Sequence, residues 1–140
     1  MMRFSRSALI VSDSAALRRY IASTLEAVRF SCREAANGFQ AMDCLSERMF
    51  DLYLIDLDTA WTDGAAILAV TLTGGFRDPS PVLIGISERP HEHALKPPWG
   101  DVSSFAALFA KPFRPSDLIA ATEAALASCT RLKAGHPSDL

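Results

Sequence analysis

The sequence has few of the features that mark a membrane, secreted or disulfide-bonded protein. No apolar stretch approaches the roughly 18–20 residues needed to cross a bilayer. The apolar run at residues 8–11 is shorter than the core of a signal peptide. Its three cysteines, Cys32, Cys44 and Cys129, are odd in number, have no metal-like spacing and lie in apolar patterns. We therefore expect free, buried thiols and a cytoplasmic protein without a membrane partner.

Concentrated positive charge is also missing. The chain of 140 residues has 14 basic and 16 acidic side chains, a formal net charge of −2, and only Arg18 and Arg19 are adjacent basic residues. A nucleic-acid-binding domain usually carries a basic patch and a high pI, so we expect no nucleic-acid partner. The length corresponds to one domain of ordinary size.

Short apolar runs alternate with helical patterns along the chain. Runs typical of strands buried on both faces occupy residues 8–11, 52–55, 82–86 and 105–110, and a weak alternation marks another strand at 30–34. Helices are indicated by stripes at Leu17, Ile21, Leu25 and Val28 and at Ala41, Leu45 and Met49, and by residues 65–72 and 117–128. Strands alternating with helices in this way predict an α/β fold with a doubly wound sheet.

Polar side chains follow four of the predicted strands. Ser12 and Asp13 come after the first strand, Asp56 after the third, Ser87 after the fourth and Lys111 after the fifth. In open parallel sheets, ligands bind in the crevice beyond the carboxyl ends of the strands. With the strand order 2-1-3-4-5, these groups converge on one pocket.

Phosphoryl transfer to a carboxylate is the chemistry that uses this set. Asp56 is the expected nucleophile. Asp13 and Asp56 supply carboxylates to a hard divalent cation, Mg²⁺ by preference. The Ser87 hydroxyl and the Lys111 ammonium are the expected partners of the phosphoryl oxygens.

The ordered set of segments resembles the receiver domains of response regulators in two-component signalling. The resemblance runs from residue 8 to about residue 126 and is carried by residues 9–13, 36–38, 50–56, 62–64, 81–87 and 111–113. It implies a flavodoxin-like (βα)5 fold with five parallel strands and a cis peptide bond between Lys111 and Pro112. It also implies that Asp56 accepts a phosphoryl group from a sensor histidine kinase or a histidine phosphotransfer protein.

On this resemblance, residues 1–7 are an N-terminal extension, residues 8–128 the receiver domain and residues 129–140 a flexible C-terminal tail. On this division of the chain we expect no output domain. We therefore expect a stand-alone response regulator that is not an enzyme and that signals by contact with a downstream protein.

The chain departs from the family at the metal site. Receivers usually carry two adjacent acids after the first strand, and Ser12 replaces the first of them, which should weaken Mg²⁺ binding and leaves Ser12 a minor contributor. Asp58 stands where the family offers a backbone carbonyl to the metal. Its own carboxylate is an alternative source of the missing charge.

Two further departures affect the expected switch. Ser87 and Leu108 occupy the switch and output positions, and Leu108 stands where receivers commonly have an aromatic residue. Pro90, Pro97 and Pro98 interrupt the region of the fourth helix, which we expect to be short or distorted.

Two alternative functions remain open. One is a receiver-like adaptor that binds partners without phosphorylation, as the departures would allow. The other is a phosphatase of haloacid-dehalogenase type, with Asp56 as nucleophile and Asp58 as acid/base. In addition, the uncharged run 64–76 and the alanine-rich last helix are either buried in the monomer or form an interface with a second copy or a partner.

Overall fold

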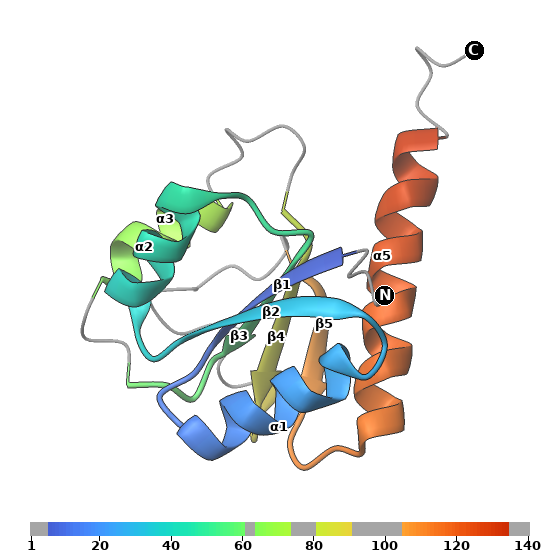
Figure 1. The fold of residues 1–140 in the computed structure, drawn as a ribbon, viewed down its shortest axis with the longest axis horizontal. Coiled ribbons are helices and arrows are strands. Elements are labelled where there is room, and N and C mark those ends of the chain that lie inside the picture. Colours follow the sequence, from blue (N-terminus) through green and yellow to red (C-terminus); the bar gives the residue numbers. More distant parts are fainter. Residues whose placement is uncertain (1–5, 61–63, 74–80, 91–104, 135–140) are drawn as a thin grey trace.

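A computed structural model describes residues 6–60, 64–73, 81–90 and 105–134. A five-stranded sheet with order β2-β1-β3-β4-β5 lies at its centre, and every neighbouring pair is parallel (Figure 1). The strands are β1 (Arg6–Val11), β2 (Phe30–Ala35), β3 (Leu52–Asp56), β4 (Leu83–Ser87) and β5 (Phe105–Ala110). The described helices are α1 (Ala15–Glu26), α2 (Gly38–Glu47), α3 (Ala65–Thr73) and α5 (Pro115–Ala134). The predicted fold class and strand order are confirmed.

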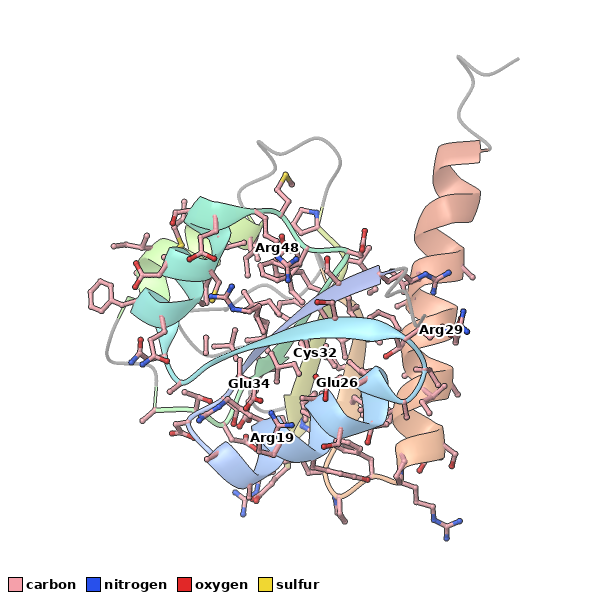
Figure 2. All side chains as sticks on the ribbon, viewed as in Figure 1. Arg19, Glu26, Arg29, Cys32, Glu34 and Arg48 are labelled. Atoms are coloured by element: carbon pink, nitrogen blue, oxygen red, sulfur yellow. The ribbon has the colours of Figure 1, made fainter. Side chains whose placement is uncertain are left out.

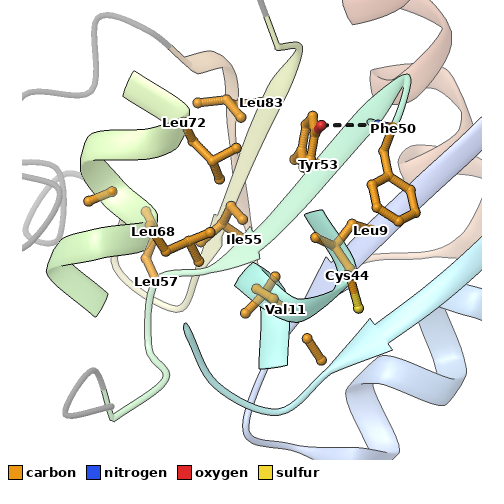
Figure 3. Close-up of a cluster of buried hydrophobic side chains, with 13 residues drawn as sticks. Leu9, Val11, Cys44, Phe50, Tyr53, Ile55, Leu57, Leu68, Leu72 and Leu83 are labelled. Carbon is orange, nitrogen blue, oxygen red and sulfur yellow. Dashed lines mark hydrogen bonds between the residues drawn. The ribbon is translucent and has the colours of Figure 1, made fainter. Parts of the chain in front are cut away.

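Helices cover both faces of the sheet, and alternate strand residues form two cores (Figure 1). Leu9, Tyr53 and Leu83 pack with α2 and α3, whereas Ile10 and Leu54 face α1 and α5. Figure 3 shows the first core, in which the Tyr53 hydroxyl also accepts a hydrogen bond of 3.0 Å from the Phe50 backbone N–H. Because β3 lies between β1 and β4 and is buried along its whole length, the rigid centre of the sheet presents its last residue, Asp56.

Local sequence signals set the helix starts. Ser14 and Asn37 cap α1 and α2, and their side chains accept hydrogen bonds from the backbone N–H of Leu17 and Gln40. Gly64, just before α3, has a φ of 73°, and a Cβ there would lie 2.6 Å from the backbone nitrogen of Phe39. Only glycine fits this close approach without strain.

Several element boundaries differ from the sequence prediction. The stripes placed Val28 and Met49 on buried helix faces, but α1 ends at Glu26, α2 ends at Glu47, and both side chains are exposed. α5 continues to Ala134, beyond the predicted end near residue 128. Residues 91–104, where the short fourth helix was predicted, and the last residues of the predicted tail lie outside the described part of the chain.

Cys32 and Cys44 are free thiols, as predicted, and the side chain of Cys129 lies outside the described set. Cys44 is buried and Cys32 is partly buried. Burial, with smaller contributions from the neighbouring carboxylates of Glu26 and Glu34, raises the pKa of the Cys32 thiol to about 12 (Figure 2). A thiol with so high a pKa is a poor nucleophile, so Cys32 has a packing role.

The two candidate contact surfaces, on α3 and α5, are each partly buried within the monomer. On α3, Leu68 and Leu72 are buried, while Ile67 and Val70 are exposed. On α5, Leu118 and Ala125 pack against the sheet. Monomer burial therefore accounts for one side of each helix. No helix in the described ranges has the length and apolar character needed to cross a membrane.

Candidate functional site

The strand ends predicted to carry chemistry meet at one edge of the sheet. Ser12 directly follows β1, Asp56 ends β3, Ser87 ends β4 and Lys111 directly follows β5. Parallel pairing places these carboxyl ends side by side, and the Lys111 backbone N–H donates to the Ser87 carbonyl at 2.9 Å.

Asp56 is a buried carboxylate, with 3% of its surface exposed. Its Oδ2 accepts a hydrogen bond from the Ser12 hydroxyl at 2.6 Å, and its Oδ1 accepts one from the Asp58 backbone N–H at 3.0 Å. The Lys111 Nζ donates to the same Oδ1 at 2.9 Å. A buried carboxylate is stable only when paired and hydrogen-bonded, and these contacts satisfy both requirements.

Ser12 is fixed from several sides. Its hydroxyl accepts a hydrogen bond from the Ser14 backbone N–H at 3.1 Å, and its carbonyl accepts one from the Arg18 guanidinium at 2.7 Å. Arg18 and Arg19 both pair with Glu34 on β2. This support orients the hydroxyl toward Asp56. Sequence reasoning identified Ser12 only as a replaced acid and missed the supporting contact from Arg18.

Lys111 lies between two carboxylates. Its Nζ is 2.9 Å from Oδ1 of Asp56 and 3.1 Å from Oδ2 of Asp58. Partial burial acts to lower the pKa of Lys111, but hydrogen bonds and charge from both aspartates outweigh it and raise that pKa above its usual value. The lysine is therefore a fixed positive charge at the site.

The loop after Lys111 is held against α1. The expected cis peptide bond joins Lys111 to Pro112. The ring of Phe113 stacks on Tyr20 with centroids 5.5 Å apart, and the Tyr20 hydroxyl donates to the Phe113 carbonyl at 2.8 Å. These contacts fix where the lysine leaves the sheet.

Asp58 faces across the sheet edge toward β4 and β5. Its carboxylate accepts hydrogen bonds from the Ser87 hydroxyl and from the Glu88 backbone N–H, both at 2.8 Å. Partial burial opposes ionisation of Asp58, but these two bonds and Lys111 outweigh it and lower the pKa of its carboxyl. The Glu88 N–H carries no signal in the sequence, because every residue except proline supplies a backbone N–H.

The predicted metal ligands do not form a cluster of three carboxylates. Across the described ranges, no group of three or more His, Cys, Asp or Glu side chains is placed to hold a metal ion. The Asp13 side chain accepts from the Ala60 backbone N–H at 3.0 Å, and the Asp58 carboxylate faces Ser87 instead. The groups that remain as metal ligands are the carboxylates of Asp13 and Asp56 and the backbone carbonyl of Asp58. Mg²⁺ is commonly held by one or two carboxylates together with water and phosphate oxygens. The donor types therefore fit Mg²⁺ without the Asp58 side chain.

Leu108 lies on β5 and is partly buried against the core that faces α2 and α3. Its Cδ2 is 3.0 Å from the position that a Cβ on Gly85 would occupy, so the Leu108 side chain packs over the glycine. The switch role predicted for Ser87 and Leu108 stays a prediction.

Comparison with solved structures identifies the fold. The chemotaxis response regulator CheY4 of Vibrio cholerae superposes with a TM-score of 0.70 at 18% identity, covering 86% of this chain and 98% of that chain. A CheY-like receiver domain from Methylobacillus flagellatus gives a TM-score of 0.68 at 22% identity, with the same coverage of 86% and 98%. The signal receiver domain of an HD domain-containing protein from Pseudomonas fluorescens Pf-5 gives 0.72 at 18% identity, covering 97% of this chain and 96% of that one. The chain has the receiver-domain fold.

No family model matches the sequence, and no curated protein matches it either. The receiver-domain fold is thus seen in the backbone, while sequence identity to these three structures is 18–22%. Asp56, at the end of the third strand, occupies the position that the sequence resemblance assigned to the phosphoacceptor. A haloacid-dehalogenase enzyme places its paired aspartates after its first strand, whereas here Asp56 ends the third strand and Asp58 follows it.

Proposed function

We propose that this protein is a response regulator whose Asp56 accepts a phosphoryl group from a sensor histidine kinase or a histidine phosphotransfer protein. The observation that carries the proposal is the contact between Asp56 and Lys111, 2.9 Å apart at the end of the buried central strand. The contact supplies a carboxylate nucleophile in a rigid position and a cation beside it. Ser12 and the Asp58 backbone N–H orient the carboxylate further.

The transfer step follows from this arrangement. An Asp56 oxygen attacks the phosphorus in line, an O–P bond forms, and the bond from phosphorus to the donor breaks with its electron pair leaving on the donor. A donor histidine leaves as imidazole after gaining a proton from solvent. Lys111 stabilises negative charge on the phosphoryl oxygens as it develops. A Mg²⁺ ion held by Asp13, Asp56 and the Asp58 carbonyl would supply further charge neutralisation.

Incubation with acetyl phosphate and Mg²⁺ tests the proposal. Under conditions that preserve acyl phosphates, the intact mass of the wild type should rise by one phosphoryl group, and that of Asp56→Asn should not change. Ser31→Ala is a matched control, because Ser31 lies in β2, outside the site, and should label like wild type. An equal mass gain, or no gain, in wild type and Asp56→Asn would exclude the phosphoacceptor function.

One observation favours a second candidate, an adaptor that binds a partner protein without phosphorylation. The Ser12 hydroxyl already donates a hydrogen bond to Oδ2 of Asp56. In receivers, an acid usually stands at the position of Ser12. For an adaptor, partner binding in a pull-down with a candidate kinase or output protein would be the same for wild type and Asp56→Asn. For a phosphoacceptor, addition of acetyl phosphate would change binding by the wild type alone.

A further inference from the structure

The carboxylate of Asp58 collects donors from two neighbouring strands. Ser87 Oγ donates to its Oδ1 at 2.8 Å, and the Glu88 backbone N–H donates to its Oδ2 at 2.8 Å. Lys111 Nζ lies 3.1 Å from the same Oδ2. A hydroxyl, an amide and an ammonium group from the ends of β4 and β5 therefore converge on one anion. A solvated loop acid would not make three such contacts.

One of these donors, Lys111, also contacts the nucleophile. Lys111 Nζ contacts Asp56 and Asp58 together, at 2.9 and 3.1 Å, so the two carboxylates lie on either side of one ammonium group. A phosphoryl group bonded to Asp56 would carry three further oxygens beside this lysine, and these oxygens need donors of the same three kinds. The Asp58 carboxylate already occupies those donors.

We propose that Asp58 is a built-in stand-in for the phosphoryl group. In the unphosphorylated chain its carboxylate fills the anion site made by the Ser87 hydroxyl, the Glu88 N–H and Lys111. The inference rests on the proposed function, because it names the competitor that an incoming phosphoryl group must displace.

Two consequences follow. Ser87 is held toward the site in the resting protein, so phosphorylation exchanges one anion for another and does not pull in an unengaged hydroxyl. Uptake of phosphate is also slowed, because only molecules in which Asp58 has moved away offer the donors. The apparent affinity for the phosphoryl group is reduced in proportion to the fraction of such molecules.

The first test uses the protein without any phosphodonor. In wild type, the Glu88 amide proton should resonate downfield and exchange slowly with solvent, since it is bound to a charged oxygen. In Asp58→Ala it should move upfield and exchange about tenfold faster, the change expected on losing a hydrogen bond to a charged group. Asp43→Ala removes an exposed acid from α2 and should leave the Glu88 signal unchanged. A Glu88 amide that is the same in wild type and Asp58→Ala overturns the proposal.

The second test adds acetyl phosphate and Mg²⁺ and follows intact mass with time. Asp58→Ala should label about tenfold faster than wild type, whereas Asp43→Ala should label at the wild-type rate. Equal or slower labelling of Asp58→Ala overturns the stand-in role while leaving Asp56 as phosphoacceptor. If wild type and both variants take up no phosphate, the proposed function fails, and the competition fails with it whatever the Glu88 amide shows.

Discussion

Ser12 donates a hydrogen bond of 2.6 Å to Oδ2 of Asp56, and both side chains are buried. The sequence resemblance places an acid at the Ser12 position, beside the acceptor. The chain instead has a hydroxyl there, which donates a hydrogen bond to one oxygen of the acceptor. This contact removes the repulsion that a second carboxylate would create and also removes a ligand for a cation.

Ser12→Asp should lower the stability of the fold and strengthen Mg²⁺ binding. Without a divalent cation, a second carboxylate beside Asp56 replaces a hydrogen bond with like charge, and we expect a loss of about 1–2 kcal/mol in the free energy of unfolding. Added Mg²⁺ should raise the melting temperature of Ser12→Asp more than that of wild type, since carboxylate number tunes affinity for hard cations. Ser12→Ala removes the hydrogen bond without adding a ligand. If Ser12→Asp and Ser12→Ala respond equally to Mg²⁺, the assignment of this position to the metal site is wrong.

Lys111→Met should destabilise the fold at neutral pH. Without the ammonium group, buried Asp56 loses its opposite charge and lies near the carboxylate of Asp58. We expect a loss of about 2 kcal/mol, less than for a fully buried pair because Lys111 is partly exposed.

Urea unfolding of single and double variants measures the coupling. Lys111→Met should cost less in an Asp58→Asn background, where one of the two carboxylates is neutral, by about 1 kcal/mol. Strictly additive losses would show that the lysine does not bridge the two aspartates.

The Asp58 carboxyl gives a pH dependence of defined sign. Its pKa is lower in the folded chain than the usual value, which is about 3.9 in an unfolded chain. The ionised form is therefore favoured by folding, and its contribution is present above about pH 4 and is lost as the pH falls through the lower folded value.

The measurement is the free energy of unfolding of wild type and Asp58→Asn at neutral pH and near pH 2.5. Wild type should be more stable by about 1 kcal/mol at neutral pH, a value reduced for partial exposure, and the difference should shrink in acid. Asp43→Asn should show no such trend, because Asp43 is exposed on α2. A difference between wild type and Asp58→Asn that grows in acid would contradict the assigned contacts.

Thr122 on α5 is 1% exposed, and within the described part of the chain its Oγ1 has no hydrogen-bond partner. Valine has nearly the same shape and no hydroxyl, so Thr122→Val should raise the free energy of unfolding by about 0.5–1 kcal/mol. Thr24 is a matched control, since it is also buried but donates to the Tyr20 carbonyl at 2.9 Å. Thr24→Val should be neutral or destabilising. A loss of stability in Thr122→Val would mean that the hydroxyl has a partner such as buried water.

The sheet and the positions of the reactive groups could be predicted because both depend on local pattern. Apolar runs placed four strands to within two residues at each end, and residues that directly end or follow strands in a parallel sheet must share an edge. Asp56, Ser87 and Lys111 were found in this way. The end of α5 was predicted too early, because residues 130–140 are polar and contain Gly135 and Pro137, whereas the helix continues to Ala134.

The direction of Asp58 could not be predicted in the same way. Two residues beyond Asp56, it was assigned to the metal site through its carbonyl or its side chain. The structure turns the carboxylate toward Ser87 and the Glu88 N–H, and the role of the carbonyl stays a prediction. That choice depends on the spacing of β3, β4 and Lys111 in three dimensions, and a backbone N–H donor leaves no trace in residue type.

Chemical trapping of the phosphorylated residue tests the central claim most directly. After incubation with acetyl phosphate and Mg²⁺, borohydride reduces an aspartyl phosphate to homoserine, and peptide mapping by mass spectrometry locates the changed residue. We predict homoserine at position 56 in wild type and in Asp58→Ala, with a larger labelled fraction in Asp58→Ala at early times. An unmodified position 56, or homoserine at position 58 in its place, would contradict the account.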